Sequence, residues 1–430
     1  MQKRINVADM LKSLKKLYRS GFFDIFGATL INSVVSFVYG IFIVRIMSQY
    51  DYGVFSYVQN ISNFGVMFCC MGANLGILQF CSERVDISLK YSYSRYAAIM
   101  GGISSVLVII IMVLYSGIDR SGLANLTGYI VEFSLLPVLY NMKDWITANL
   151  RWQIKNREYS IVLNIHSVAN AVFAVLGAWI WGIHGVILGI YLAYICSILV
   201  GTYFLRGGFV HAVQRASKLT SANKNKFVKY SVTMCIVNAL ISVLYSVDLF
   251  VIGNIMQNAE DIAMYKTACV IPFALNMVPN SIMIFVYPHI AMHKEDNGWM
   301  KKNIKLLYLA NGALNLLIGL SLFAGAPIII SILFGDRYEG ILPVFRVLIL
   351  SYILSACLRT PAANLFGMLR KTKTALIISG STVVLSVCLG IAFVSRLGII
   401  GAACGSVCTF GSVGIVSTAI LIRGIYFNKK

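Results

Sequence analysis

YAAIMGGISSVLVIIIMVLY, residues 96–115, is a stretch without a single charged side chain. A helix needs about 20 mainly apolar residues to cross the hydrocarbon core of a bilayer, so this stretch predicts a transmembrane helix. Comparable stretches recur along the chain and are separated by short polar connections. The composition, with 58% hydrophobic and 12% charged residues, leaves too little polar surface for a soluble protein. We therefore expect an all-α polytopic membrane protein.

The apolar stretches predict about 12 transmembrane helices. They cover residues 22–47, 54–80, 96–115, 123–148, 161–181, 183–205, 227–252, 262–291, 304–333, 341–368, 375–394 and 399–423. If the N-terminus is cytoplasmic, the predicted external loops hold only three basic residues, namely Arg120, Arg337 and Arg396. Cytoplasmic loops of membrane proteins are enriched in Lys and Arg, so both termini are predicted to be cytoplasmic. The same rule explains the net charge of +20 without a nucleic-acid partner.

Similarities between the two halves of the chain predict two six-helix lobes, related by a pseudo-two-fold axis along the membrane normal. The tripeptide Ala-Asn-Leu ends the fourth span at 148–150 and the tenth at 363–365, and a basic turn follows each. The predicted parts are a basic amphipathic lead-in (1–21), an N-terminal lobe (22–205), a cytoplasmic linker (206–226), a C-terminal lobe (227–423) and a cytoplasmic tail (424–430).

The sequence contains none of the common motifs of catalysis or cofactor binding. No Gly-Lys step occurs, so a nucleotide-binding P-loop is excluded, and neither H-E-x-x-H nor G-x-S-x-G is present. The 10 cysteines form no C-x-x-C pair and lie mostly in apolar stretches, where they are expected to pack. We expect no metal and no cofactor. Short external loops with few acidic residues weigh against a polysaccharide polymerase or glycosyltransferase, and we do not expect an enzyme.

The stretch VRIMSQYDYGVFSY, residues 44–57, resembles the first external loop of the Wzx-type polysaccharide flippases, in which an Arg, a short acidic turn and a Gly precede the second span. Residues 245–253 resemble that family's seventh span, and residues 364–371 resemble the exit of its tenth. The chain departs from the family at Ile262 and Ala263, where a Gly often precedes the Tyr. These flippases belong to the multidrug/oligosaccharidyl-lipid/polysaccharide exporter superfamily.

The resemblance implies movement of an undecaprenyl-diphosphate-linked oligosaccharide to the outer leaflet of the bacterial plasma membrane by alternating access. The oligosaccharide would be the repeat unit of an O-antigen of lipopolysaccharide, a capsule or another surface polysaccharide, and polysaccharide-assembly proteins would be its partners. A multidrug exporter of the same superfamily is the nearest alternative. Cations inside the membrane disfavour it, because they would repel cationic drugs.

Basic residues inside the predicted spans are the candidates for substrate binding, since each is costly in hydrocarbon unless it faces a partner or a wet cavity. They are Arg359, Arg45, Arg346, Lys266 and Lys143. Arg359 lies nearest the middle of the membrane, and an arginine can bind two phosphate oxygens at once. Pro361 predicts an irregular turn, whose free carbonyls could hold Arg359 instead. Arg45 and Arg346 could reach the interface, and Lys143 could simply pair with Asp144.

Acidic and amide side chains inside the spans predict coupling to an ion and a polar cavity. Asp248 and Glu132 are candidates for ion coupling, although Asp248 could simply pair with Lys266 at similar depth. Asn238, Ser242, Tyr245 and Asp248 recur on one helix face, which predicts a face toward a cavity. Asn276 and Asn280 accompany Pro272 and Pro279 in the eighth span, a pattern typical of a kinked helix that lines protein or water.

Overall fold

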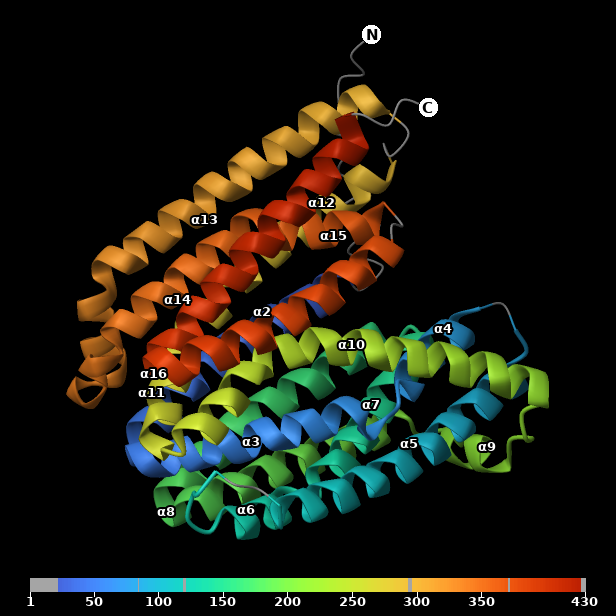
Figure 1. Cartoon of the computed structure of the whole chain (residues 1–430). Coiled ribbons are helices and arrows are strands. Elements are labelled where there is room, and N and C mark those ends of the chain that lie inside the picture. The colour runs from blue at the N-terminus through green and yellow to red at the C-terminus, as the bar shows by residue number, and fades with distance from the viewer. Residues whose placement is uncertain (1–21, 84, 119–120, 293–295, 370–371, 427–430) are drawn as a thin grey trace. The chain divides into compact units, whose positions relative to one another are not determined.

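The protein is helical throughout the part described by a computed structural model, which comprises residues 22–83, 85–118, 121–292, 296–369 and 372–426 (Figure 1). Its elements are α2 (Phe22–Ile46), α3 (Gln49–Cys69), α4 (Ala73–Ser82), α5 (Ile87–Ser116), α6 (Leu126–Phe133), α7 (Leu136–Trp152), α8 (Asn156–Phe204), α9 (Phe209–Arg215), α10 (Ser221–Met256), α11 (Ala259–Ala274), α12 (Met277–Met292), α13 (Asn297–Phe334), η1 (Asp336–Ile341), α14 (Leu342–Leu354), η2 (Ser355–Arg359), α15 (Thr360–Met368) and α16 (Thr372–Tyr426). The predicted lead-in and Arg120 lie outside the described residues.

Nine helical stretches of the described chain are long and apolar enough to cross a membrane. Two of them, α8 and α16, are helical hairpins. In α8 the backbone leaves the helical conformation at Trp181 and Gly182, and in α16 it does so at Gly398. A Cβ atom on Gly177 would lie 2.0 Å from the carbonyl oxygen of Gly185, so the two halves of α8 pack backbone against backbone. Each hairpin supplies two of the predicted spans, and the all-α polytopic fold is confirmed.

Proline and asparagine shape the predicted eighth span, which is broken between α11 and α12. Pro272 lies inside α11, and the helix ends two residues later. The amide of Asn276 donates to the carbonyl oxygens of Pro272 and Phe273, at 3.3 and 3.4 Å. The Asn276 side chain thus binds two carbonyls at the break between α11 and α12.

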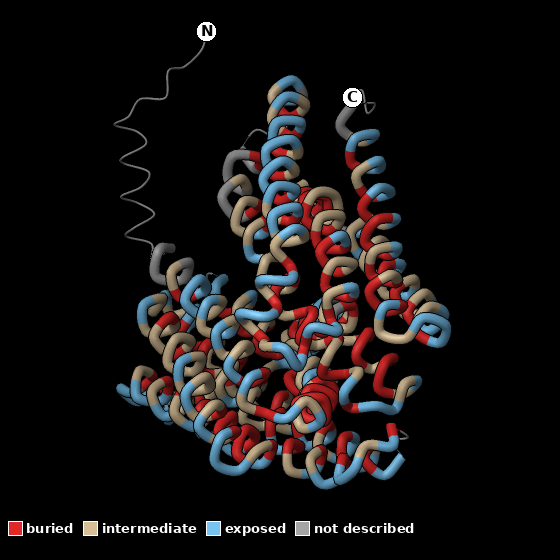
Figure 2. Tube along the Cα trace, turned by 90° about the vertical axis from the view of Figure 1, so that its left-hand side faces the viewer, coloured by how far each residue is buried: buried red, intermediate tan, exposed pale blue. Residues whose placement is uncertain are grey.

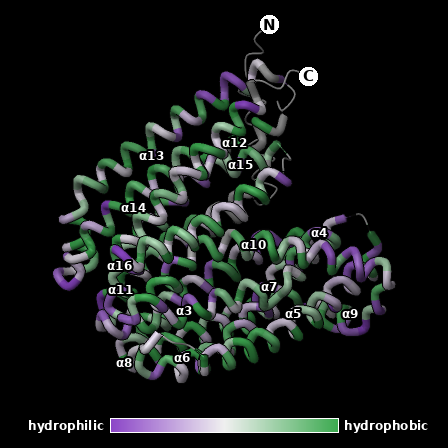
Figure 3. The backbone as a smooth tube through the Cα atoms, in the orientation of Figure 1, coloured by the Kyte–Doolittle hydropathy of each residue, from purple (hydrophilic) through white to green (hydrophobic). Residues whose placement is uncertain are grey.

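The side chains along the helices are distributed as in a protein surrounded by lipid. Hydrophobic residues follow the lengths of the helices, whereas hydrophilic residues gather at helix ends and connections (Figure 3). Exposed and buried residues alternate within the turns of the long helices (Figure 2). Large apolar side chains such as Ile111 and Leu114 of α5 are exposed by 62% and 63%. In water such a surface would associate, so these faces fit contact with acyl chains.

The described chain forms two compact units. The first comprises the described residues within 22–39, 65–115 and 130–236, and the second comprises those within 40–64, 116–129 and 237–426. Two apolar clusters lie in the first unit, around Phe227 and around Leu150. In the second unit Phe366, Leu365 and Ala362 of α15 form the centre of another. The second unit includes the end of α2 and most of α3, so contacts do not strictly follow chain order. The two six-helix lobes stay a prediction.

Candidate substrate site

Arg359 lies at the end of a π-helical turn in the second unit. Between α14 and α15, residues Ser355–Arg359 form η2, in which the N–H of Thr360 donates to the carbonyl of Ser355, five residues back. Pro361 comes directly after and has no N–H to donate, which favours a local departure from the α-helical pattern. Single π turns inside α-helices are frequent at functional sites. The irregular turn predicted from Pro361 is present.

The guanidinium of Arg359 is half-buried beside an aromatic ring. Its Nε donates to Oγ of Ser355 at 3.1 Å, and its central carbon lies 4.7 Å from the ring centre of Phe410. Arg359 lines a pocket, the Arg359 pocket, together with the hydroxyl side chains of Ser379, Thr382 and Ser417. A guanidinium beside several hydroxyl groups can bind an anionic group such as a phosphate.

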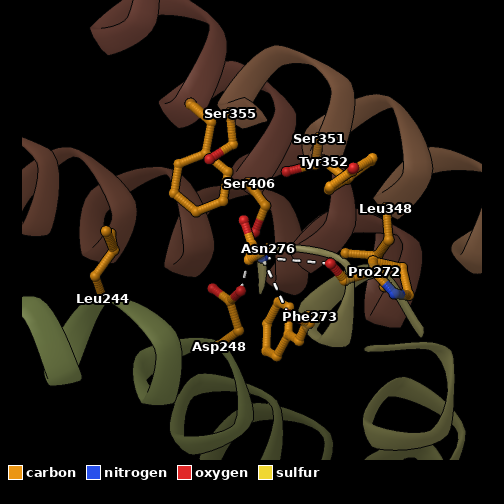
Figure 4. A pocket seen from close by; sticks show the side chains of 11 residues that line it. Leu244, Asp248, Pro272, Phe273, Asn276, Leu348, Ser351, Tyr352, Ser355 and Ser406 are labelled. Atoms are coloured by element: carbon orange, nitrogen blue, oxygen red, sulfur yellow. Dashed lines mark hydrogen bonds between the residues drawn. The ribbon is translucent and has the colours of Figure 1, made fainter. Parts of the chain in front are cut away.

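Asp248 lies in a second pocket of the same unit, the Asp248 pocket (Figure 4). One of its carboxylate oxygens, Oδ2, accepts hydrogen bonds from the hydroxyl of Tyr265 at 2.7 Å and that of Ser406 at 2.9 Å. Asn276, Tyr352 and Ser355 also line this pocket. An acidic group that is buried with two hydroxyl donors can take up or release a proton or bind a small cation.

The two pockets lie close together. Leu244 lines both of them. Ser355 lines the Asp248 pocket and accepts a hydrogen bond from Arg359, which lines the other pocket. The predicted cation and the predicted coupling acid thus belong to one continuous region, formed by α10, α11, α14, η2 and α16.

Asp248 is bound by Tyr265 and Ser406 and not by Lys266, the partner considered from the sequence. No ion pair joins Asp248 to Lys266, although both residues belong to the described part of the chain. Lys266 is half-buried in α11 and lines neither pocket. The alternative that Asp248 is merely neutralised by Lys266 is therefore wrong. The assignment of Lys266 to substrate binding stays a prediction.

Of the polar residues predicted to line a cavity, Asn276 lines the Asp248 pocket, while Asn238, Ser242 and Asn280 line neither pocket. Asn238 and Asn280 are exposed. The side chain of Tyr245 lies outside the described residues.

The two arginines near the predicted external surface have local partners. Nε and Nη2 of Arg45 donate to the carbonyls of Leu333 and Ile332, the first bond measuring 2.8 Å. Arg346 stacks on Phe323, with 5.1 Å between its guanidinium carbon and the ring centre. Its buried Nε has no hydrogen-bond partner among the described residues. Arg45 is thus engaged by main chain, whereas Arg346 retains a donor for a further group.

Lys143 in the first unit is held by aromatic rings. Its ammonium lies 5.4 Å from the ring centre of Tyr140 and 5.1 Å from that of Tyr194. Asp144 instead accepts a hydrogen bond from Asn74, at 2.9 Å. Cation–π contacts hold a lysine without neutralising its charge, so Lys143 can still attract an anion.

Glu132, the other candidate for ion coupling, belongs to the first unit. Its carboxylate lies 2.6 Å from Nδ1 of His184, and the two side chains are exposed by 34% and 63%. This exposed position differs from the buried position of Asp248.

Sequence reasoning did not identify Tyr265, Ser406, Ser355 or Phe410 as members of the site. Ser406 bonds Asp248 across 158 positions of the chain. It lies in a run of small residues, 401–406. In such a run the sequence does not distinguish a serine that binds a partner from a small residue that only packs. Only Tyr265 had a signal. It follows Ile255-Met256 and Glu260 much as Tyr57 follows Ile46-Met47 and Asp51 in the first half of the chain.

Comparisons with known proteins agree with this fold. Residues 19–294 match the family model described as "Polysaccharide biosynthesis protein". A search of curated proteins found no match. An inward-facing multidrug resistance MATE transporter of the MOP superfamily is similar with a TM-score of 0.75 and 15% identity, over 93% of this chain and 96% of that one. The lipid II flippase MurJ in an inward closed conformation has a TM-score of 0.73 and 13% identity, over 93% and 87%. A MOP transporter from Pyrococcus furiosus has a TM-score of 0.56 and 12% identity, over 95% of each chain.

Proposed function

The chain belongs to the polysaccharide biosynthesis protein family, and from that premise we propose that it is a flippase for an anionic lipid-linked oligosaccharide. The cargo is an undecaprenyl-diphosphate-linked repeat unit of a surface polysaccharide, such as an O-antigen or a capsule. The protein moves it from the cytoplasmic to the outer leaflet of the bacterial plasma membrane by alternating access. Its termini are cytoplasmic, and its activity is transport rather than catalysis.

The observation that carries this proposal is the position of Arg359 in a pocket with three hydroxyl groups. A diphosphate headgroup offers several oxygen acceptors, and a guanidinium can donate two parallel hydrogen bonds to them. The guanidinium of Arg359 stacks on the ring of Phe410 and donates a hydrogen bond to Ser355. These contacts limit the rotamers of the side chain and favour one orientation of the guanidinium. Arg359 is therefore assigned to the diphosphate.

Lys143 is the proposed contact for anionic parts of the cargo in the first unit. Tyr140 and Tyr194 hold its ammonium without neutralising it. Aromatic faces are also suited to sugar rings, because both present apolar surface with polar edges. Arg346 and Lys266 stay predicted contacts, for which no described partner of opposite charge is seen.

The energy for transport is assigned to the membrane potential and to Asp248. A headgroup with about two negative charges gains roughly 4 to 5 kcal/mol on moving outward through an inside-negative potential of ~100 mV. Asp248 carries a proton or small cation in the opposite direction, and Tyr265 and Ser406 bind its carboxylate.

A multidrug exporter is the second candidate function, because the fold matches a multidrug transporter as well as a lipid flippase. The two functions require opposite electrostatics. A cationic drug would be repelled by Arg359, whereas a diphosphate would be attracted.

Reconstitution into liposomes separates these functions. We would compare the flipping of fluorescent undecaprenyl-diphosphate oligosaccharide, the same oligosaccharide on a neutral lipid, and the uptake of a cationic dye. The proposal requires flipping of the diphosphate lipid that is faster than flipping of the neutral lipid. Dye transport without flipping of the diphosphate lipid would overturn it in favour of the multidrug exporter.

A further inference from the structure

The π turn that carries Arg359 leaves one main-chain carbonyl without a main-chain donor. In an α-helix, the carbonyl of Ala356 would accept from the N–H of Thr360, but that N–H donates to Ser355 instead. In a π-helix, the donor to Ala356 would come from residue 361, which is a proline and has no N–H. Ala356 is fully buried. Its carbonyl must find a side-chain donor or remain unsatisfied, which destabilises a buried polar group.

Asn311 of α13 supplies this donor. Its amide Nδ2 lies 2.8 Å from the carbonyl oxygen of Ala356, and the side chain is 1% exposed. The amide of Asn315, one turn further along α13, donates to Oδ1 of Asn311 at 3.0 Å. This second bond fixes the orientation of the Asn311 amide, because its oxygen faces Asn315 and its nitrogen faces Ala356.

The chain of hydrogen bonds continues to the Asp248 pocket. The hydroxyl of Tyr352 donates to Oδ1 of Asn315 at 2.5 Å, and Tyr352 lines that pocket. Asn315 is fully buried. The three side chains, which we call the Asn311 network, therefore run from the pocket through α13 to the turn that ends at Arg359. Buried polar networks of this kind rigidify the groups they contact when every member has a partner.

The π turn determines the direction in which Arg359 points. A π-helical turn holds more residues than an α-helical turn, so each residue advances by less than the 100° of an α-helix, and the residues at its end are rotated around the axis relative to their places in a continuous α-helix. An α-helical turn would place Arg359 on another part of the helix circumference than the one facing Phe410. We propose that Asn311, supported by Asn315 and Tyr352, is a positioning residue that holds the π turn and thereby orients Arg359 toward the substrate. The orienting role rests on the proposed function.

The first experiment tests the hydrogen-bond account without any substrate. Asn311→Leu should lower the melting temperature of the detergent-solubilised protein by about 1 to 4 °C. The loss should shrink in a Pro361→Ala background, because the N–H restored at position 361 gives the Ala356 carbonyl a main-chain donor. Equal losses of melting temperature in the wild-type and Pro361→Ala backgrounds would contradict the claim that Asn311 supplies the donor missing at the Ala356 carbonyl. Asn303→Leu is the control, since Asn303 lies on the same helix and its amide donates within that helix, to Trp299.

The second experiment tests positioning by a double-mutant cycle in the flipping assay. Asn311→Leu should raise the apparent KM for the fluorescent diphosphate lipid by about 3- to 10-fold. In an Arg359→Ala background the same change should leave KM unaltered. An equal rise in both backgrounds would overturn the positioning role and leave the proposed function standing. If Arg359→Ala itself leaves KM unaltered, the headgroup assignment fails, and the melting-temperature cycle still decides whether Asn311 holds the turn.

Tyr352→Phe provides a milder variant if Asn311→Leu does not fold. It removes only the outermost hydrogen bond of the Asn311 network and preserves the ring. The expected result is a smaller rise in apparent KM that again disappears in the Arg359→Ala background. A rise in apparent KM that persists in the Arg359→Ala background would contradict the claim that the Asn311 network acts through Arg359.

Discussion

Arg45 caps the C-terminal end of α13, and Arg337 caps the C-terminal end of α2. Arg45, in the last turn of α2, donates to two carbonyls in the last turn of α13, and Arg337, just after α13, donates to the carbonyl of Arg45 at 3.0 Å. The last carbonyls of a helix lack intrahelical partners and carry partial negative charge, so each guanidinium is well placed. This arrangement links a segment of the first half of the chain to the second half.

We predict that Arg45→Ala destabilises the protein without weakening substrate binding. It removes two hydrogen bonds, whereas Arg337→Ala removes one, so the melting temperature should fall by about 1 to 3 °C and by less for Arg337→Ala. Thermal unfolding and the apparent KM for the fluorescent lipid would be measured together. A raised KM at an unchanged melting temperature would return Arg45 to the substrate contacts predicted from its place in the membrane.

Gly53 is predicted to be indispensable for the packing of α3 on α11. A Cβ atom at this position would lie 1.8 Å from the carbonyl oxygen of Ala259, so Gly53→Ala must push the two backbones apart. The matched control is Gly312→Ala in α13, where a Cβ atom meets nothing within 4 Å and alanine is the better helix former. Gly53→Ala should lower the melting temperature by several degrees, and Gly312→Ala should not. Equal melting temperatures would contradict the close approach.

Asp248→Asn is predicted to separate flipping from a proton or sodium gradient. The amide keeps the size of the side chain and can still accept from Tyr265 and Ser406, but it cannot exchange a proton or neutralise a cation. Flipping by Asp248→Asn should therefore respond to the membrane potential and no longer to an imposed ion gradient. Glu132→Gln is the comparison, because Glu132 is the other predicted coupling residue and lies beside His184. If Asp248→Asn keeps the full gradient response, coupling does not occur at Asp248.

The membrane potential is predicted to accelerate outward flipping by the wild-type protein. Each elementary charge moved across 100 mV is worth about 2.3 kcal/mol, so a doubly charged headgroup is favoured by roughly 4 to 5 kcal/mol at equilibrium. Liposomes with a potassium diffusion potential set by valinomycin test this directly. Identical initial rates at zero and at inside-negative potential would count against a charged cargo.

The helices could be predicted from the sequence because their signal is local. Runs of apolar residues identify the spans, and Gly182 lies where one predicted span gives way to the next and α8 turns back on itself. Pro361 likewise predicted the irregular turn that ends at Arg359 and the carbonyl that it frees. These features depend on neighbours within a few positions of the chain.

The partners in the site could not be predicted, since they are distant in sequence and chemically ordinary. The donor to Ala356 is an asparagine 45 positions away, and Arg45 reaches carbonyls 287 and 288 positions away. Their similar depth in the membrane suggested that Asp248 and Lys266 could pair. Depth does not determine how each helix is rotated about its axis, and therefore does not determine whether the two side chains face each other. The hydroxyls of Tyr265 and Ser406 take the place expected for Lys266.

The most direct test of the account is the rate at which Arg359→Ala flips undecaprenyl-diphosphate oligosaccharide in liposomes, compared with wild type and with Arg396→Ala. Arg396 is an exposed arginine of the same unit and lines neither pocket, so its loss controls for the removal of one positive charge. A hydrogen bond to a charged group is worth about 1.5 to 3 kcal/mol, so Arg359→Ala should slow flipping at limiting substrate by about 10- to 100-fold. Arg396→Ala should flip at the wild-type rate. Equal rates for wild type and Arg359→Ala would contradict the assignment of Arg359 to the diphosphate.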